Sequence, residues 1–172
     1  DLKNLRAESM SLASMLAVQY LGIAGSGRLL DICAAPGMKG LYASYAQPDI
    51  QYYCNDLSKD RLARLKRLFD KHGKSIAGMT HFDARFIDRA YDVESFDRIL
   101  IDAPCSGEGV ALGGDVELAD AWSPAKVRRL QQLQIKILKS AWNLLAPGGR
   151  MVYATCTLNR NENERVIKKA LG

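Results

Sequence analysis

The chain is 172 residues long, with 48% hydrophobic and 25% charged residues. This length and composition fit one globular domain that can bury a proper core. No apolar run is long enough to span a bilayer, and residues 1–6 lack the apolar stretch and cleavage site of a signal peptide. We therefore expect a single domain over residues 1–172 of an intracellular protein, cytoplasmic in general and nucleolar if the source is eukaryotic, with no membrane partner.

The formal net charge is +5 and the sequence pI is about 9.1. A positive balance suits a polyanionic partner, because Lys and Arg release counterions when they neutralise phosphates. Many basic proteins bind no nucleic acid, so the charge gives only mild support for an RNA or DNA partner.

Four cysteines stand at positions 33, 54, 105 and 156, and the chain has two histidines. The cysteines form no Cys-x-x-Cys pair, so the spacing does not predict a zinc site and we expect no metal. Cys54 lies inside an apolar run and is predicted to be a small buried hydrophobe. Cys105 and Cys156 follow predicted strands instead, which that interpretation explains poorly.

Short apolar runs alternate with longer amphipathic ones, a pattern that predicts a parallel sheet covered by helices. The predicted strands are residues 28–33, 50–55, 76–82, 96–101 and 150–155. The predicted helices are residues 9–21, 41–46, 58–73, a long one from 123 that ends at Pro147-Gly148-Gly149, and a last one opened by a capping box of Asn161 and Glu164. Residues 1–27 supply the N-terminal helix and a turn into the core, and residues 106–120 form a Gly-rich loop.

In open α/β sheets, ligands bind beyond the carboxyl ends of the strands. Each predicted strand is followed by candidate ligand-binding residues, namely Cys33 to Gly40, Asp56, Asp83, Asp102 to Gly107, and Thr155 to Thr157. A lone acid after a strand is commonly a turn former or helix cap, and for Asp83 that alternative stays open. No Gly-x-Gly-x-x-Gly follows the first strand, which argues against a dinucleotide cofactor.

Three of these segments resemble signature motifs of the RNA 5-methylcytosine methyltransferase family, of the RsmB and Sun type. They are Asp31-Ile-Cys-Ala-Ala-Pro-Gly-Met-Lys39, Asp102-Ala-Pro-Cys-Ser-Gly107 and Val152-Tyr-Ala-Thr-Cys-Thr157. The resemblance runs from about Ser14 to Glu164 in the family's motif order. It implies an α/β, Rossmann-like methyltransferase fold with a mostly parallel sheet and helices on both faces, and S-adenosylmethionine as the cofactor.

The resemblance also assigns roles to individual residues. It implies that the cofactor is bound by Cys33, Ala34, Ala35, Pro36, Gly37, Met38, Lys39, Asp56, Asp83 and Asp102, with Asp56 at the ribose and Asp83 at the adenine. The implied catalytic residues are Cys156 as nucleophile, Cys105 for release of the product, Asp102 between cofactor and base, and Lys39, which could lower a thiol pKa.

The implied reaction needs a thiolate and an acid. Adding a thiolate at C6 of cytosine breaks the aromaticity and makes C5 nucleophilic, and an acid near N3, here Asp102, favours that adduct. The resemblance implies the strand order common to methyltransferases, in which the fourth and fifth strands are neighbours about 4.8 Å apart, so Cys105 and Cys156 would project into one cleft. Spacing does not decide which sulfur attacks, and Cys156 is chosen on the resemblance alone.

The sequence departs from the family pattern in several places. Met38 and Gly40 replace the commoner Gly and Thr, and the stretch before Ser14 lacks the Gln-Asp that often precedes the first helix. These changes bear on cofactor affinity more than on reaction type. The chain stops soon after the fifth strand, so we expect a fragment without the final strands of a methyltransferase sheet.

We expect the partner to be RNA, with ribosomal RNA favoured over transfer RNA. The methylated cytosine is expected to be unstacked when it reacts. The expected oligomeric state is a monomer. The alternatives are a methyltransferase acting on an exocyclic amine, a catalytically silent RNA-binding scaffold, and a nicotinamide oxidoreductase.

Overall fold

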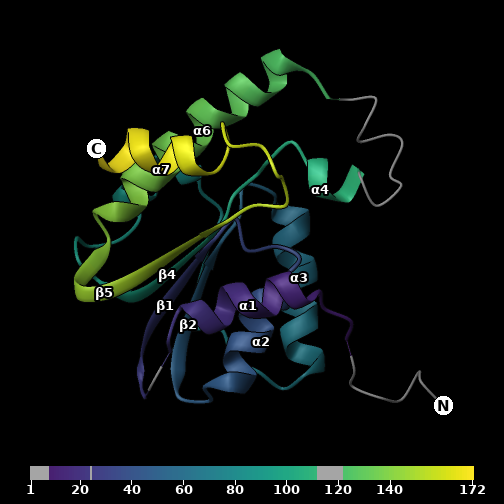
Figure 1. Cartoon of the computed structure of the whole chain (residues 1–172). Helices are drawn as coiled ribbons and strands as arrows, with labels where there is room; N and C mark the ends of the chain where they lie inside the picture. The colour runs from purple at the N-terminus through teal and green to yellow at the C-terminus, as the bar shows by residue number, and fades with distance from the viewer. Residues whose placement is uncertain (1–7, 24, 112–121) are drawn as a thin grey trace.

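The computed structural model describes residues 8–23, 25–111 and 122–172 (Figure 1). Its elements, in chain order, are α1 (Leu12–Tyr20), β1 (Gly27–Ile32), α2 (Met38–Ala46), β2 (Ile50–Asn55), α3 (Lys59–Lys71), β3 (Gly78–Thr80), the 3-10 helix η2 (Ala84–Arg89), β4 (Phe96–Asp102), α4 (Glu108–Ala111), α6 (Pro124–Trp142), β5 (Leu145–Ala154) and α7 (Glu164–Leu171).

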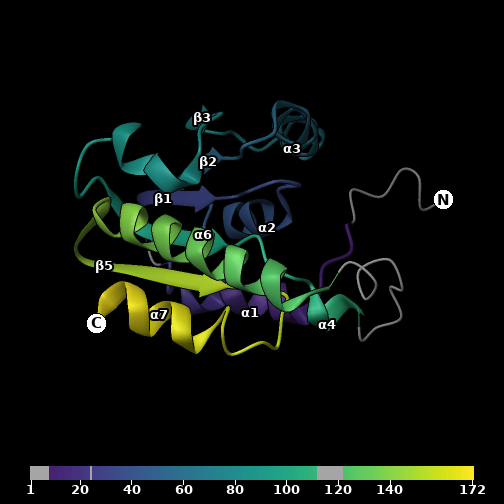
Figure 2. The ribbon, with the colours of Figure 1, turned by 90° about the horizontal axis from the view of Figure 1, so that it is seen from above.

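The five strands form one sheet in the order β3-β2-β1-β4-β5, and every neighbouring pair is parallel. The arrows of β1 and β5 accordingly point the same way in Figure 2. The chain runs outward from β1 to β3 and then returns to place β4 on the other side of β1. This reversal puts the ligand-binding end of the sheet at the carboxyl ends of β1 and β4.

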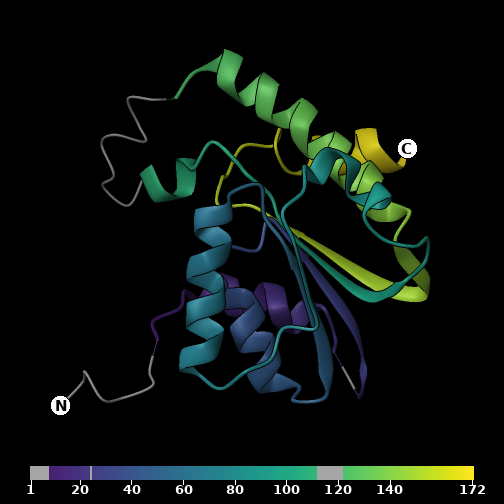
Figure 3. The same ribbon diagram turned by 180° about the vertical axis from the view of Figure 1, so that it is seen from behind.

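Helices cover both faces of the sheet, as predicted. Figure 1 and the reverse view in Figure 3 show α1, α2 and α3 on one face and α6 and α7 on the other. Successive residues of β1 point to opposite faces, so Leu29 packs in the core beneath α2 and α3 while Leu30 packs in the core beneath α6. The α/β, Rossmann-like fold of methyltransferases is confirmed.

The two most strongly patterned helices form as their sequences predict. Ser58 caps α3 by accepting a hydrogen bond from the Arg61 amide, and Leu62, Leu65 and Phe69 form its buried stripe. Ser123 caps α6 in the same way, and Pro124 occupies the first turn. These helices hold the carboxyl edge of the sheet from opposite faces.

The predicted end of the long helix is wrong. Helix α6 ends at Trp142, and Pro147-Gly148-Gly149 belongs to β5. Phe96 pairs with Leu145 and Arg98 with Arg150, so β5 carries extra residues in a bulge opposite β4. The bulge suits this sequence because Pro has no amide hydrogen for the ladder and Gly148 adopts a positive φ of 74°.

Smaller differences concern the loops. Strand β3 spans only residues 78–80, η2 and α4 were not predicted, and α2 begins at Met38. The predicted capping box is wrong, because α7 begins after Asn163 rather than after Asn161. Residues 112–120 of the predicted Gly-rich loop and residues 1–7 of the predicted N-terminal segment lie outside the described residues.

Within the described part of the chain, no helix has the length and apolar character needed to cross a membrane. The assignment of residues 1–172 to a single domain stays a prediction.

Candidate active site

The loop after β1 closely approaches α3. Gly37 caps α2 with a φ of 106°, a conformation that L side chains rarely adopt. A Cβ atom at Gly37 would lie 2.7 Å from Cγ of Leu65, so space also excludes a side chain. Upstream, the Ala34 amide donates to the Asn55 carbonyl at 2.9 Å. The predicted cofactor loop is therefore fixed between β2 and α3, at the carboxyl edge of the sheet.

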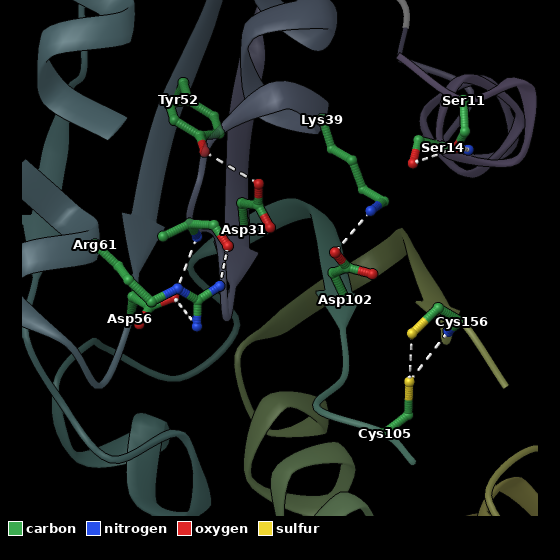
Figure 4. Close-up of polar contacts among 11 residues, drawn as sticks. Ser11, Ser14, Asp31, Lys39, Tyr52, Asp56, Arg61, Asp102, Cys105 and Cys156 are labelled. Carbon is green, nitrogen blue, oxygen red and sulfur yellow. Dashed lines mark hydrogen bonds and ion pairs between the residues drawn. The ribbon is translucent and has the colours of Figure 1, made fainter. Parts of the chain in front are cut away.

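Asp56 ties this loop to the end of β2. Its buried carboxylate accepts hydrogen bonds from the amides of Ala35 at 3.2 Å and Ser58 at 3.0 Å, and Arg61 lies 3.4 Å away (Figure 4). Arg61 also donates to the Ala35 carbonyl. These partners leave room for a further hydroxyl group on Asp56, because each carboxylate oxygen can accept more than one hydrogen bond and the half-exposed Arg61 side chain can move. The ribose role of Asp56 stays a prediction.

Asp83 is a helix cap, as the alternative interpretation held. It accepts a hydrogen bond from the Arg85 amide and pairs with the Arg85 guanidinium at 2.5 Å, which lowers the pKa of the carboxyl. It also borders a cavity of about 420 Å³. The cavity is lined by Leu57, Asp83, Arg85, Arg129, Leu130, Gln132, Leu133 and Lys136. Capping does not exclude the adenine role, which stays a prediction.

Lys39 reaches from α2 across the end of the sheet to Asp102 at the end of β4. Their Nζ and Oδ2 atoms are 2.6 Å apart, and Figure 4 shows this pair between the first-strand loop and the cysteines. The lysine is mostly buried and the aspartate is about one-third exposed. A charged donor therefore lies against Asp102, and the role of this acid beside a target base stays a prediction.

Cys105 and Cys156, the cysteines of the second and third motifs, lie side by side. Their sulfurs are 2.8 Å apart, and the Cys156 amide lies 3.2 Å from the Cys105 sulfur (Figure 4). Both thiols are free, and Cys156 is exposed. The parallel pairing of β4 and β5 produces this arrangement, because both residues follow the ends of adjacent strands.

The two thiols differ in acidity. The hydrogen bond from Cys105 lowers the pKa of Cys156 to about 7, and the charge of Lys39 contributes in the same direction. Donating that bond, together with burial, raises the pKa of Cys105 far above its ordinary range. Burial also raises the pKa values of Cys33 and Cys54 to about 12. Cys156 is therefore the thiol with the largest thiolate fraction at neutral pH.

A buried pair of polar side chains holds the two cysteine loops from behind. Glu162 accepts hydrogen bonds from the Ser106 amide at 3.0 Å and from Gln134 Nε2 at 2.9 Å, and Gln134 also donates to the Pro104 carbonyl. Ser106 Oγ donates to Thr157 Oγ1 at 3.1 Å, which links the two loops directly. We call Glu162 and Gln134 the brace. Sequence reasoning missed it, although a Gln on the apolar side of a long helix was a visible signal.

Asp31 was also missed as a site residue. It is buried in β1, its Oδ2 accepts from the Tyr52 hydroxyl at 3.0 Å, and its Oδ1 is buried without a hydrogen-bond partner in the structure as described. Burial and the negative charge of Asp102 raise its pKa to about 8. An acid inside the apolar run of β1 was the signal that could have identified it.

A family model described as 16S rRNA methyltransferase RsmB/F matches residues 18–172. The chain belongs to this family. It is 40% identical over 162 residues to ribosomal RNA small subunit methyltransferase F of Serratia proteamaculans, and the match covers 92% of this chain and 34% of that protein. The resemblance found in the motifs is thereby confirmed at the level of the family.

Solved structures agree with this assignment. A methyltransferase homologue from Pyrococcus horikoshii superposes with a TM-score of 0.78 at 31% identity, over 92% of this chain and 49% of that one. NSun6 from Pyrococcus horikoshii, solved with SFG, superposes with a TM-score of 0.82 at 27% identity, over 93% and 40%. The RsmB/F chain described here thus spans about a third of its curated relative and less than half of these structures.

Proposed function

We propose that this RsmB/F domain methylates C5 of a cytosine in RNA, ribosomal RNA more than transfer RNA, through a covalent adduct between Cys156 and C6 of the base. The contact between the two thiols, 2.8 Å apart at the carboxyl edge of the sheet, carries this proposal. An amine-methylating enzyme has no need of a thiolate, and the low pKa of Cys156 supplies one.

The described residues fit S-adenosylmethionine, the cofactor on which the family depends. SFG, present in the NSun6 structure, is an analogue of it. The orphaned Oδ1 of buried Asp31 offers a hydrogen-bonding group near the end of β1, and the largely apolar cavity beside Asp83 suits a nucleobase. We propose that the loop of residues 33–39, Asp56 and Asp83 hold the cofactor, which when bound supplies an electrophilic methyl group.

The first step uses Cys156. Its thiolate forms a bond to C6 of the cytosine, and the electron pair of the C5–C6 double bond moves into the ring towards N3. N3 is proposed to be neutralised by a proton that passes from the Lys39 ammonium through Asp102, whose Oδ2 lies 2.6 Å from Lys39 Nζ. C5 then carries the electron density that would form the new carbon–carbon bond to the methyl group, while the methyl–sulfur bond of the bound cofactor would break and leave its sulfur as a neutral thioether.

The last step uses Cys105. Before the reaction its thiol donates to the Cys156 thiolate, which keeps its pKa high. Once the Cys156 sulfur is bonded to C6 it carries no negative charge, so the Cys105 thiol can ionise more easily. Cys105 can then take the C5 proton, and the Cys156–C6 bond breaks as the aromatic ring re-forms.

The test uses purified protein, cytosine-containing ribosomal RNA and cofactor with a labelled methyl group. We expect Cys156→Ala to abolish labelling and Cys105→Ala to accumulate a protein–RNA adduct that survives denaturing electrophoresis, with Cys54→Ala as the matched control. Label recovered on the exocyclic amine of cytosine would support an amine methyltransferase instead. Full turnover by Cys156→Ala would overturn the proposal, and no transfer by the unmodified protein would favour a silent scaffold.

A further inference from the structure

Gly40 lies against the side chain of Tyr52, which leaves no room for a side chain at position 40. It lies buried in the first turn of α2, directly after Lys39. A Cβ atom at this position would come closer than 3.0 Å to three atoms of Tyr52, including the hydroxyl oxygen. The φ of Gly40 is not positive, so space rather than backbone conformation excludes a side chain here.

Tyr52 cannot easily move away from Gly40. Its side chain is 1% exposed, and its ring stacks on that of Phe69 with centroids 4.9 Å apart and an interplanar angle of 11°. Its hydroxyl donates a hydrogen bond of 3.0 Å to Asp31. The phenol therefore fills the volume over Gly40 and ends on the buried carboxyl group of β1 (Figure 4).

The position of Asp31 matters to the site. The charges of Asp102 and Lys39 both act on it, so it lies within electrostatic range of the pair at the end of β4. It also immediately precedes the loop that begins after Ile32 and is proposed to hold the cofactor. A buried carboxyl group without its donor could turn towards another partner, and Lys39 would then be shared between two acids.

We propose that Tyr52 is a positioning residue for the cofactor loop, and that it forms a matched pair with Gly40. Its hydroxyl holds Asp31 in place, and its ring occupies the volume that any side chain at position 40 would need. This inference rests on the proposed cofactor site but not on the identity of the methylated base.

The test is a double-mutant cycle read by calorimetric binding of S-adenosylhomocysteine without RNA. We expect Gly40→Thr to weaken binding at least tenfold, because the new side chain collides with Tyr52 and displaces α2. Tyr52→Val makes room but also removes the hydroxyl, so the double variant Gly40→Thr/Tyr52→Val should bind within about threefold of the single variant Tyr52→Val. A Gly40→Thr penalty as large in the Tyr52→Val background as in the parent protein would overturn the matched pair.

A second variant isolates the hydroxyl. Tyr52→Phe keeps the ring and its stacking on Phe69, so a purely structural role predicts unchanged binding. We expect about tenfold weaker binding and a raised KM for the cofactor, with an unchanged KM for RNA. Equal binding by Tyr52→Phe and the parent would remove the hydroxyl from the proposal. If the parent protein itself bound no S-adenosylhomocysteine, the cofactor site would fail; if it bound cofactor but methylated no cytosine, only the reaction proposed above would fail.

Discussion

The two halves of the carboxyl edge of the sheet differ in the partners that their functional side chains contact. Beyond β1, β2 and β3, the acids already have protein partners: Asp56 holds two amides and Arg61, and Asp83 holds Arg85. Beyond β4 and β5, the reactive groups are two thiols that contact each other, while the polar partners lie behind them in the brace.

The same residue type behaves differently in the two halves. Cys33, at the end of β1, is buried and lies near negatively charged aspartates. Both effects raise the pKa of its thiol to about 12. Cys156, at the end of β5, receives a hydrogen bond that lowers its pKa to about 7. A cysteine at a strand end therefore has a raised pKa where it is buried among acids. It has a lowered pKa, and a thiolate fit for reaction, where a donor stabilises the thiolate and solvent can reach it.

The largest effect is expected from breaking the brace. Glu162→Ala should lower methyl transfer by about 10- to 100-fold, because a loosened Cys105 loop misplaces reacting atoms. It should also cost about 1–3 kcal/mol of stability, because it leaves the buried Ser106 amide unpaired and removes one of the two acceptors of Gln134. Glu162→Gln, which keeps an acceptor oxygen, should lose less. Methyl transfer and urea denaturation measure the two quantities.

Glu164 provides the control for the brace. It is exposed and pairs only with Arg160 at 3.5 Å among the described ion pairs, so Glu164→Ala should leave both quantities nearly unchanged. If Glu164→Ala and Glu162→Ala lowered methyl transfer equally, the brace would have no special role in placing Cys105.

A smaller effect concerns the acidity of Cys156. About half of this thiol is ionised at pH 7 in the parent protein, and removal of the donor in Cys105→Ala should raise the pKa towards about 8.5. The rate of Cys156 alkylation by iodoacetamide at pH 7 should then fall about tenfold, as followed by mass spectrometry of the peptide that contains Cys156. If Cys105→Ala left the pH dependence of the alkylation rate unchanged, Lys39 or the backbone would set the pKa of Cys156 instead.

The last prediction concerns a dependence of stability on pH in the cofactor half. The pKa of Asp31 is raised to about 8 in the fold, so between pH 4 and 8 the folded state keeps a proton that the unfolded state has lost. Stability should therefore fall as pH rises through this window, by up to about 1.4 kcal/mol per pH unit from this one group. Urea denaturation at pH 5 and pH 8 should show that Asp31→Asn flattens the slope.

An exposed acid serves as the comparison for Asp31. Asp60 lies in the first turn of α3, and Asp60→Asn should leave the slope as it is in the parent protein. An Asp31→Asn variant with the parent's slope would mean that the carboxyl group is ionised in the fold.

Much of this architecture could be predicted from the sequence, because it rests on local patterns. The apolar runs gave all five strands, and the caps at Ser58 and Ser123 gave the starts of α3 and α6. The meeting of Cys105 and Cys156 could be anticipated because adjacent parallel strands end at the same edge of the sheet.

The rest depends on contacts between distant parts of the chain. Glu162 meets Ser106 across 56 positions, and Tyr52 meets Asp31 across 21, so no local period reveals either pair. The β5 bulge was misread because Pro147-Gly148-Gly149 is equally good at ending a helix and at interrupting a ladder. A polar residue on an apolar face was the available signal in the sequence. It indicates that the residue has a buried hydrogen-bond partner, but it does not identify that partner.

The most direct test of the account is to identify the cysteine that bonds to the base. RNA containing 5-fluorocytosine has no C5 proton to remove, so the adduct should persist after methyl transfer, and digestion with mass spectrometry can locate it. The account predicts a methylated nucleotide on the peptide that contains Cys156. The same nucleotide on the peptide that contains Cys105, or on neither, would contradict it.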